Sequence, residues 1–236
     1  MIMTWKEKAL EHAKQEQPRE SCGLLVINKG EEYYVPCKNL ALHLDAQFMI
    51  DPDDWIRAED KYGAIIGIVH SHPFSPPQPS PADLACCEKY NIKWYIVSPI
   101  NNLWYSFEPS GYKPPLIGRQ WVWGVQDCWT LVRDFYKQKG INIKDFERPK
   151  YPQDFQDNPI FDSSWQECGF RELDYNEDLQ PNDALLLRIR STGLNHVAVY
   201  VGEQKLLHHL SFRLSSHDTY DKNLVKCTGR RLRYAS

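Results

Sequence analysis

The stretch AIIGIVHSHPFSPPQPSPAD, residues 64–83, decides the fold and the chemistry of the first half of the chain. It opens with an apolar run of the length of a buried strand, and that run leads straight into His70 and His72. Because alternate residues of a strand face the same side, the two imidazoles are expected to point to one place. Asp83 lies just inside a helix that Ser80 can start, so its carboxylate can return to that place.

Two histidines and one aspartate form a metal-ligand set. They fill three positions of a tetrahedral zinc site and leave the fourth for water, which is the arrangement of a catalytic rather than a structural zinc. Zinc lowers the pKa of such a water to about 7, yet a nearby base still has to take its proton and pass it to the leaving amine. Glu20, in PRESCGLLV at the start of the first predicted hairpin, is the candidate base.

Glu20 together with the pattern H-x-H-x7-S-x2-D resembles the JAMM (MPN) metallopeptidases, and the likeness spans nearly all of the first half of the chain. The resemblance implies that zinc is held by His70, His72 and Asp83. It also implies that Glu20 is the general acid and base and that Ser80 stabilises the oxyanion. Two alternatives stay open: HSHP is only a turn and Asp83 a helix cap, or the site binds metal without turnover.

A second constellation lies in the second half of the chain. Cys128, in GVQDCWTLV, begins a helix predicted over residues 128–139, where unpaired backbone N–H groups and the helix dipole favour a thiolate. Such a nucleophile needs an imidazole, and NHVAVYVG offers His196 at the start of a strand. His208 follows twelve residues later, after a turn at Gly202, so antiparallel pairing can bring it beside His196.

A helix-borne Cys followed by His and His on neighbouring strands resembles the NlpC family of papain-like cysteine peptidases. The resemblance implies a triad of Cys128, His196 and His208 that cuts peptidoglycan stem peptides. Trp121 departs from the family, because it stands where a Tyr usually supplies an oxyanion contact. His209 is the alternative to His208, since adjacent strand residues face opposite ways, and a buried structural thiol is the alternative for Cys128.

The composition break EPSGYKPPLIGRQ separates two self-contained regions, so a linker is expected over residues 109–118. Residues 1–108 are predicted to form a JAMM-like α/β sandwich, and residues 119–236 a papain-like (NlpC) α+β domain; the fold class is α/β plus α+β. The predicted helices and strands cover residues 5–17, 22–28, 31–38, 52–62, 64–70, 81–90, 94–98, 103–107, 128–139, 184–189, 196–202 and 205–210, before a basic segment ending in RRLRY.

The composition limits the classes of partner and the environment that are expected for this protein. The 236 residues include 28 Lys and Arg against 31 Asp and Glu, and a formal charge of −3 argues against nucleic acid as a partner. No run of 18 apolar residues and no apolar signal core is present, which predicts synthesis in the cytoplasm without membrane insertion. Seven cysteines without an even, short-spaced framework favour reduced thiols. Arg230, Arg231 and Arg233 fit either an acidic partner or a solvated edge strand.

A JAMM-like module directly ahead of an NlpC-like module resembles the tail-tip assembly proteins of lambda-like phages. The resemblance implies other phage tail-tip proteins as partners, peptidoglycan stem peptide as the substrate of the cysteine module, and a zinc module that processes a tail protein or the same wall. It implies the host cytoplasm during assembly, with the virion tail tip and host cell wall on delivery. A metal-dependent processing peptidase and a non-catalytic structural assembly factor are the open alternatives.

Overall fold

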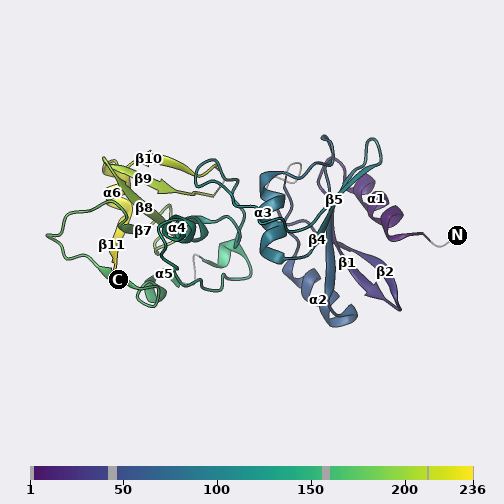
Figure 1. Cartoon of the computed structure of the whole chain (residues 1–236), viewed down its shortest axis with the longest axis horizontal. Coiled ribbons are helices and arrows are strands. Elements are labelled where there is room, and N and C mark those ends of the chain that lie inside the picture. The colour runs from purple at the N-terminus through teal and green to yellow at the C-terminus, as the bar shows by residue number, and fades with distance from the viewer. Residues whose placement is uncertain (1–2, 42–46, 156–159, 212, 236) are drawn as a thin grey trace. The chain divides into compact units, whose positions relative to one another are not determined.

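The computed structural model describes residues 3–41, 47–155, 160–211 and 213–235 (Figure 1). The chain divides into two compact units, Met1–Lys113 and Pro114–Ser236, and this division falls inside the segment 109–118. Each unit contains its own sheet, so each can be described by itself.

The sheet of the first unit has five strands: β1 (Cys22–Asn28), β2 (Glu31–Cys37), β3 (Ile65–Ser71), β4 (Lys93–Ser98) and β5 (Leu103–Phe107). Their order is β2-β1-β3-β4-β5. The central strand β3 pairs antiparallel with β1 and parallel with β4. Its nearly continuous apolar sequence fits that place, because both faces of a central strand are covered.

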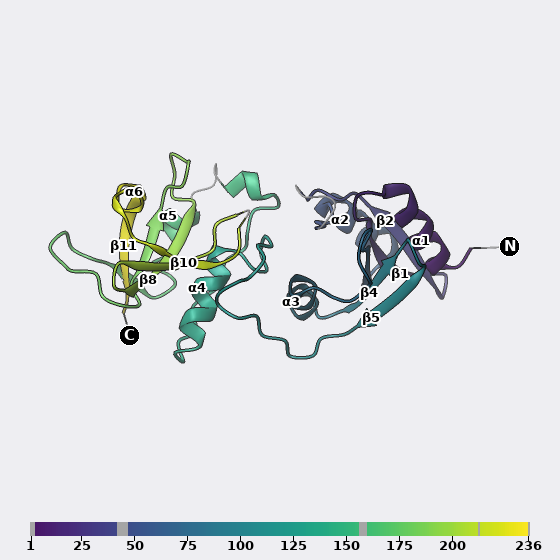
Figure 2. The same cartoon turned by 90° about the horizontal axis from the view of Figure 1, so that it is seen from above.

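The helices of the first unit are α1 (Trp5–Glu16), α2 (Pro52–Tyr62) and α3 (Pro81–Tyr90). In Figure 2, α1 lies on one side of β4 and α3 on the other. Ala9 of α1 belongs to a buried cluster with Leu25 and Val69. Because side chains alternate along a strand, His70 faces the opposite side of the sheet from Val69 and α1. The histidine therefore lies on the face that α3 approaches.

The second unit contains α4 (Cys128–Lys137), η1 (Pro152–Phe155), α5 (Ile160–Ser164), β6 (Phe170–Glu172), β7 (Ala184–Leu187), β8 (His196–Gly202), β9 (Lys205–His208), β10 (Ser216–Thr219), α6 (Lys222–Cys227) and β11 (Thr228–Tyr234). Its sheet has the order β10-β9-β8-β7-β11-β6. The helix α4 packs against β8 and β9, and Trp129, Val132 and Tyr136 join Val197 in the core. This apolar face of α4 brings Cys128, its first residue, to the sheet.

The structure corrects some predicted elements of the second unit. The helix α4 ends at Lys137 instead of residue 139, since Gln138 is its C-cap and Gly140 has a φ of 79°. The strands β6 and β10 and the helix α6 lie where a loop or no regular element was expected. They are too short to show a hydrophobic period in the sequence.

The basic C-terminal strand is not an edge strand. β11 lies between β7 and β6, and its arginines form contacts inside the unit. Arg230 lies 2.7 Å from Glu172, and Arg233 lies 2.8 Å from the buried Asp183. These acidic partners account for the basic segment without an external polyanion.

Two further observations bear on the environment of the chain. Among the described residues, no helix combines the length and the apolar character needed to cross a bilayer. All seven cysteines are free thiols, in agreement with the prediction of reduced thiols, and Cys227 is the one that is only half buried.

Candidate active sites

The end of β3 and the start of α3 bring three metal-ligating side chains together. Nε2 of His70 lies 3.2 Å from Nε2 of His72. The carboxylate oxygens of Asp83 lie 3.4 Å from Nε2 of His70 and 3.7 Å from Nε2 of His72. Ligand atoms at roughly 2.0–2.1 Å from a tetrahedral zinc are roughly 3.3 Å apart, so this triangle fits a zinc ion.

Neighbouring groups hold both imidazoles in the orientation that a metal needs. Nδ1 of His72 lies 3.1 Å from the carbonyl oxygen of Pro76, so an N–H there leaves the lone pair of Nε2 for the cluster. The ring of His70 is stacked on Phe48, with centroids 4.5 Å apart, and meets Trp94 edge-on at 5.7 Å. The site is therefore supported by a second layer of contacts.

Ser80 and Asp83 form the capping box of α3. The backbone N–H of Ser80 donates to Oδ2 of Asp83 at 2.7 Å, and the N–H of Asp83 donates to the Ser80 hydroxyl at 3.2 Å. The same carboxylate thus caps the helix and faces the two histidines. The cap interpretation and the ligand interpretation of Asp83 are compatible, because they use different lone pairs.

The electrostatics of the cluster favour a charged Asp83. Burial alone would raise the pKa of Asp83, but the charge of His70 and hydrogen bonds from both histidines outweigh it, so the pKa lies well below its usual range. Burial lowers the pKa of His72, but the hydrogen bonds with Asp83 and Pro76 and the charge of Glu20 raise it overall. Asp83 is therefore in the ionised form that binds a metal.

Glu20 lies immediately beside this cluster. The next residue, Ser21, receives the N–H of Ser71 at its carbonyl oxygen at 3.0 Å and donates its own N–H to the Ser71 hydroxyl at 2.8 Å. Ser71 is the residue between the two histidines, so these bonds tie the segment of Glu20 to them. Glu20 is 6% exposed, and its negative charge reaches His72.

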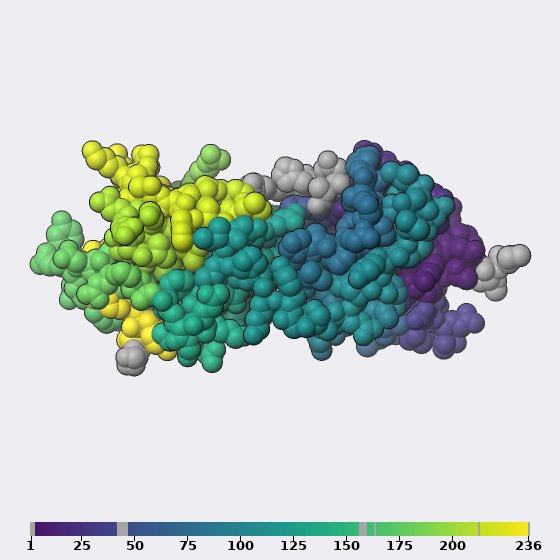
Figure 3. Space-filling view, turned by 45° about the horizontal axis from the view of Figure 1, so that its top comes forward, coloured from purple at the N-terminus to yellow at the C-terminus, as the bar shows by residue number. Residues whose placement is uncertain are grey.

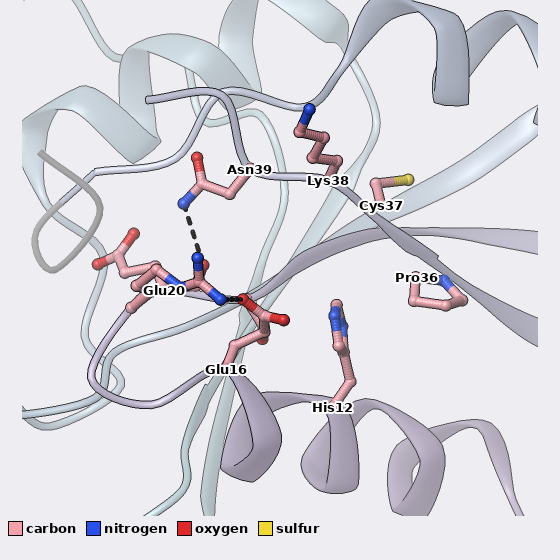
Figure 4. A pocket seen from close by; sticks show the side chains of 9 residues that line it. His12, Glu16, Glu20, Pro36, Cys37, Lys38 and Asn39 are labelled. Carbon is pink, nitrogen blue, oxygen red and sulfur yellow. Dashed lines mark hydrogen bonds and ion pairs between the residues drawn. The ribbon is translucent and has the colours of Figure 1, made fainter. Parts of the chain in front are cut away.

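A pocket of about 340 Å³ also borders Glu20 (Figure 4). Asn39 donates from Nδ2 to the carbonyl oxygen of Glu20 at 3.0 Å, and Arg19 forms an ion pair with Glu16 at 2.9 Å. In the view of Figure 4, Glu20 lies to the left, and Glu16 lies between it and His12. The lining of this pocket is largely polar and includes Glu20 but none of the three residues of the cluster.

Cys128 lies at the N-terminus of α4, as predicted. Asp127 is the N-cap and accepts the N–H of Thr130 at 2.8 Å, while Arg148 lies 2.9 Å from its carboxylate. The backbone N–H of Val197, the residue after His196, lowers the pKa of the Cys128 thiol, although burial outweighs it. Cys128 and Val197 belong to the same buried cluster, so the thiol lies near the start of β8, which is also the position of His196.

The two predicted histidines of the second unit are in direct contact. Nε2 of His196 lies 3.1 Å from Nδ1 of His208. His208 pairs with Ala198 in the β8–β9 ladder, so it lies diagonally across from His196. Asp218 on β10 extends the series, with Oδ2 3.1 Å from Nε2 of His208. The structure brings His208, and not His209, to His196.

The ionisation of this site differs from the expectation of a thiolate. Burial, and then the charge of Asp127, raise the pKa of the Cys128 thiol to about 12. Burial and the neighbouring His208 and His209 lower the pKa of His196 well below its usual value. No hydrogen bond joins the thiol to the imidazole in the part of the chain that the structure describes. Burial therefore disfavours the charged forms of both the thiol and the imidazole.

One predicted position of the cysteine site remains untested, and one residue beside the site was not predicted. Trp121, at the place of the usual oxyanion Tyr, stacks on Trp123 with centroids 5.9 Å apart, so an oxyanion role for its indole stays a prediction.

Asp218 was not identified by the sequence analysis. Its signal was a short alternating segment, SHDT, whose Ser216 and Asp218 are half buried, but that segment is too short to identify alone.

The comparisons with known proteins follow the same division. Residues 4–108 match the family model of prokaryotic homologs of the JAB domain, and residues 118–230 match that of the NlpC/P60 family. Desampylase of Pyrococcus furiosus is 30% identical over 83 residues, which cover 34% of this chain and 59% of that protein. Both predicted domain resemblances and the α/β plus α+β fold class are thereby confirmed.

Two relatives align with most of the chain. Tail tip assembly protein K of Escherichia phage N15 is 35% identical over 226 residues, covering 94% of this chain and 91% of that protein. Tail tip assembly protein K of Escherichia phage lambda is 34% identical over 173 residues, covering 72% of this chain and 82% of that protein. This chain therefore belongs to the tail tip assembly protein K family, with a JAB domain followed by an NlpC/P60 domain.

Proposed function

We propose that the second unit is a cysteine peptidase that cuts peptidoglycan stem peptides, with Cys128 as nucleophile, His196 as base and His208 as its partner. The observation that carries the proposal is the 3.1 Å contact between the rings of His196 and His208. Two buried imidazoles joined through their nitrogens, next to a cysteine at a helix N-terminus, are the parts of a nucleophile–base–orienter set. Membership of the NlpC/P60 family supports the same chemistry.

In the proposed reaction His196 transfers one proton in each of two half-reactions. Nδ1 of His196 takes the proton of Cys128 while the sulfur bonds to the carbonyl carbon of the scissile peptide. The imidazolium then gives the proton to the leaving amine as the C–N bond breaks, which leaves a thioester. Water, deprotonated by His196, cleaves the thioester and restores the thiol. Because burial raises the pKa of Cys128, we propose that the thiol loses its proton during the attack.

We infer a second peptidase site in the first unit, carried by the triangle of His70, His72 and Asp83. A zinc ion held there would supply a Lewis acid at the scissile carbonyl. Glu20 would take the proton of the attacking water on its carboxylate and give it to the leaving amine. Ser80 accepts the N–H of Asp83, which leaves its own O–H to donate to the developing oxyanion.

We propose that both units act during assembly of a phage tail tip, because the two relatives that align with most of the chain carry that name. The partners would be other tail-tip proteins, in the host cytoplasm during assembly. The cysteine unit would meet its substrate in the host cell wall, at the virion tail tip. The metal unit would process a tail protein.

Purified peptidoglycan tests the cysteine site directly. The full chain is expected to release stem-peptide fragments, and Cys128→Ala to release none while keeping its zinc content. Glu20→Gln is the matched variant from the other unit and should cut the wall normally. Fragment release by Cys128→Ala at the normal rate would overturn the proposal. For the metal site, Glu20→Gln expressed during phage growth should leave a tail protein uncut; normal processing would exclude a tail-protein substrate.

A further inference from the structure

We propose that Asp218 is a positioning residue that fixes which nitrogens of His196 and His208 carry protons. This inference rests on the proposed cysteine peptidase site. Nε2 of His208, the nitrogen that does not face His196, lies 3.1 Å from Oδ2 of Asp218. Ser216 of β10 pairs directly with His208, and Asp218 follows two residues later on the same face. The sheet therefore places a carboxylate at the outer end of the two-histidine series.

A carboxylate at that end influences which ring nitrogens of His208 and His196 carry a hydrogen. An ionised carboxylate only accepts, and its oxygen 3.1 Å from Nε2 of His208 favours the hydrogen on that nitrogen, although the angle there lies outside hydrogen-bond geometry. Nδ1 of His208 is then the acceptor. Nε2 of His196 then donates to Nδ1 of His208, since the two atoms are 3.1 Å apart. Nδ1 of His196 is left with a lone pair. That lone pair is what a base needs in order to accept the proton of Cys128.

Without Asp218 the opposite arrangement becomes available. His208 could carry its hydrogen on Nδ1 and donate to Nε2 of His196. His196 would then carry its own hydrogen on Nδ1 and could not accept a proton from Cys128. Asp218 excludes this arrangement without touching the thiol.

Asp218 is itself held in its ionised form. Arg213 donates to it through both terminal nitrogens, at 2.8 and 2.9 Å, and the Ser216 hydroxyl donates at 3.1 Å. Burial raises the pKa of Asp218, but the bonds from Arg213 and His208 lower it overall. Among the described residues, the charged or titratable groups that face His208 are Asp218 on β10, Arg213 before it and His196 on β8.

Asp218 and Arg213 can be replaced without opening the core. Their side chains are 27% and 45% exposed, and the C-terminal part of the chain, yellow in Figure 3, reaches the surface. Asp218→Ala removes the acceptor, and Asp218→Glu should restore it. Glu203→Gln removes a carboxylate from the adjacent β8–β9 turn, where Glu203 pairs only with Lys205 among the described residues, and serves as the matched control.

The tautomers of the histidines are the first measurement. In ¹⁵N-histidine spectra of the full chain near neutral pH, both His196 and His208 should carry their hydrogen on Nε2. Asp218→Ala should shift either ring toward the Nδ1–H form, whereas Asp218→Glu and Glu203→Gln should keep the original pattern. An unchanged pattern in Asp218→Ala would overturn the proposal.

The reactivity of Cys128 is the second measurement, and it separates the two proposals. Alkylation by iodoacetamide at pH 7, followed by peptide mapping, should be about tenfold slower at Cys128 in Asp218→Ala. The half-buried Cys227 is the internal reference for unfolding and should react equally in all variants. If His196→Ala alkylates at the normal rate, the peptidase proposal itself fails. If His196→Ala is slow but Asp218→Ala is normal, only the role of Asp218 fails.

Discussion

Both units contain two histidines and one aspartate at a sheet, but they arrange them differently. In the first unit, His70, His72 and Asp83 converge, with all ligand atoms within 4.8 Å of one another. In the second unit, His196 touches His208 on the neighbouring strand, and His208 touches Asp218. The first arrangement surrounds a point, and the second forms a line.

Strand position accounts for the difference. Histidines two residues apart at the end of one strand present the same nitrogen, Nε2, to the same place, which suits a cation. Histidines on adjacent strands meet Nε2 to Nδ1, so that each ring passes a hydrogen bond to the next, which suits proton transfer. The same residue types therefore form a convergent cluster in one unit and a series of ring contacts in the other.

The largest expected effect concerns the cysteine site of the second unit, with its series of His196 and His208. Cys128→Ala should lower the release of wall fragments by at least roughly 10³-fold, because nothing replaces the nucleophile. Its zinc content should stay at the level of the unmodified chain, as measured by elemental analysis. A drop in zinc content would show that the two sites are not independent, and the comparison would fail.

The next largest effect concerns the cluster of His70, His72 and Asp83 in the first unit. His72→Ala should weaken zinc binding by roughly 100-fold or more, because two of three protein ligands remain and the loop around Pro76 loses its anchor. Competition with a chromophoric chelator measures the affinity. His12→Gln is the control, since His12 faces Tyr34 and not the cluster. Equal zinc affinity in His72→Ala and His12→Gln would contradict the assigned ligand set.

A pH effect is expected for the buried histidines of the second unit. Burial and the charge of Arg119 lower the pKa of His209 to about 4. The unfolded chain takes up a proton there below about pH 6.5 and the folded chain only near pH 4, so acid favours unfolding. At pH 5 this histidine should cost about 2 kcal/mol of stability relative to pH 8.

Urea unfolding at pH 8 and pH 5, followed by hydrogen exchange in peptides of the second unit, measures that cost. His209→Leu should reduce the pH dependence by about that amount, and the exposed His217→Gln should leave it unchanged. Equal pH dependence in all three proteins would refute the depressed pKa of His209.

The smallest effect concerns the capping box. Ser80→Ala should lower the free energy of unfolding of the first unit by about 1 kcal/mol, because the N–H of Asp83 loses its acceptor. Ser80→Thr should keep most of the stability. Zinc affinity should change little in either variant, since the backbone N–H of Ser80 still holds Asp83. A large loss of zinc in Ser80→Ala would show that the hydroxyl supports the metal and not only the helix.

The first unit was predictable from sequence because its signals are local. The apolar run before His70, the proline-rich loop and the Ser80–Asp83 cap lie within one short stretch. Its strands and helices are long enough to show their period, and only the exact ends moved. The ligand set depends on one strand and one helix start, so no distant pairing had to be guessed.

The second unit was less predictable because its site depends on distant pairings. Asp218 reaches His208 only through the register of the short strand β10. Burial opposes the thiolate that the sequence predicts at Cys128, and the two effects differ in magnitude. A helix N-terminus stabilises a thiolate by roughly 0.3–1 kcal/mol, whereas a pKa raised from 9.0 to about 12 corresponds to about 4 kcal/mol in the other direction.

X-ray absorption at the zinc edge tests most directly whether the cluster of the first unit, and not the histidine pair of the second, binds metal. The sample is the full chain, loaded with zinc and freed of excess. The triangle of His70, His72 and Asp83 predicts one zinc per chain with nitrogen and oxygen neighbours at roughly 2.0–2.1 Å. A sulfur neighbour at roughly 2.3 Å, which would mean that Cys128 and the second histidine pair take the metal, or no bound zinc at all, would contradict it.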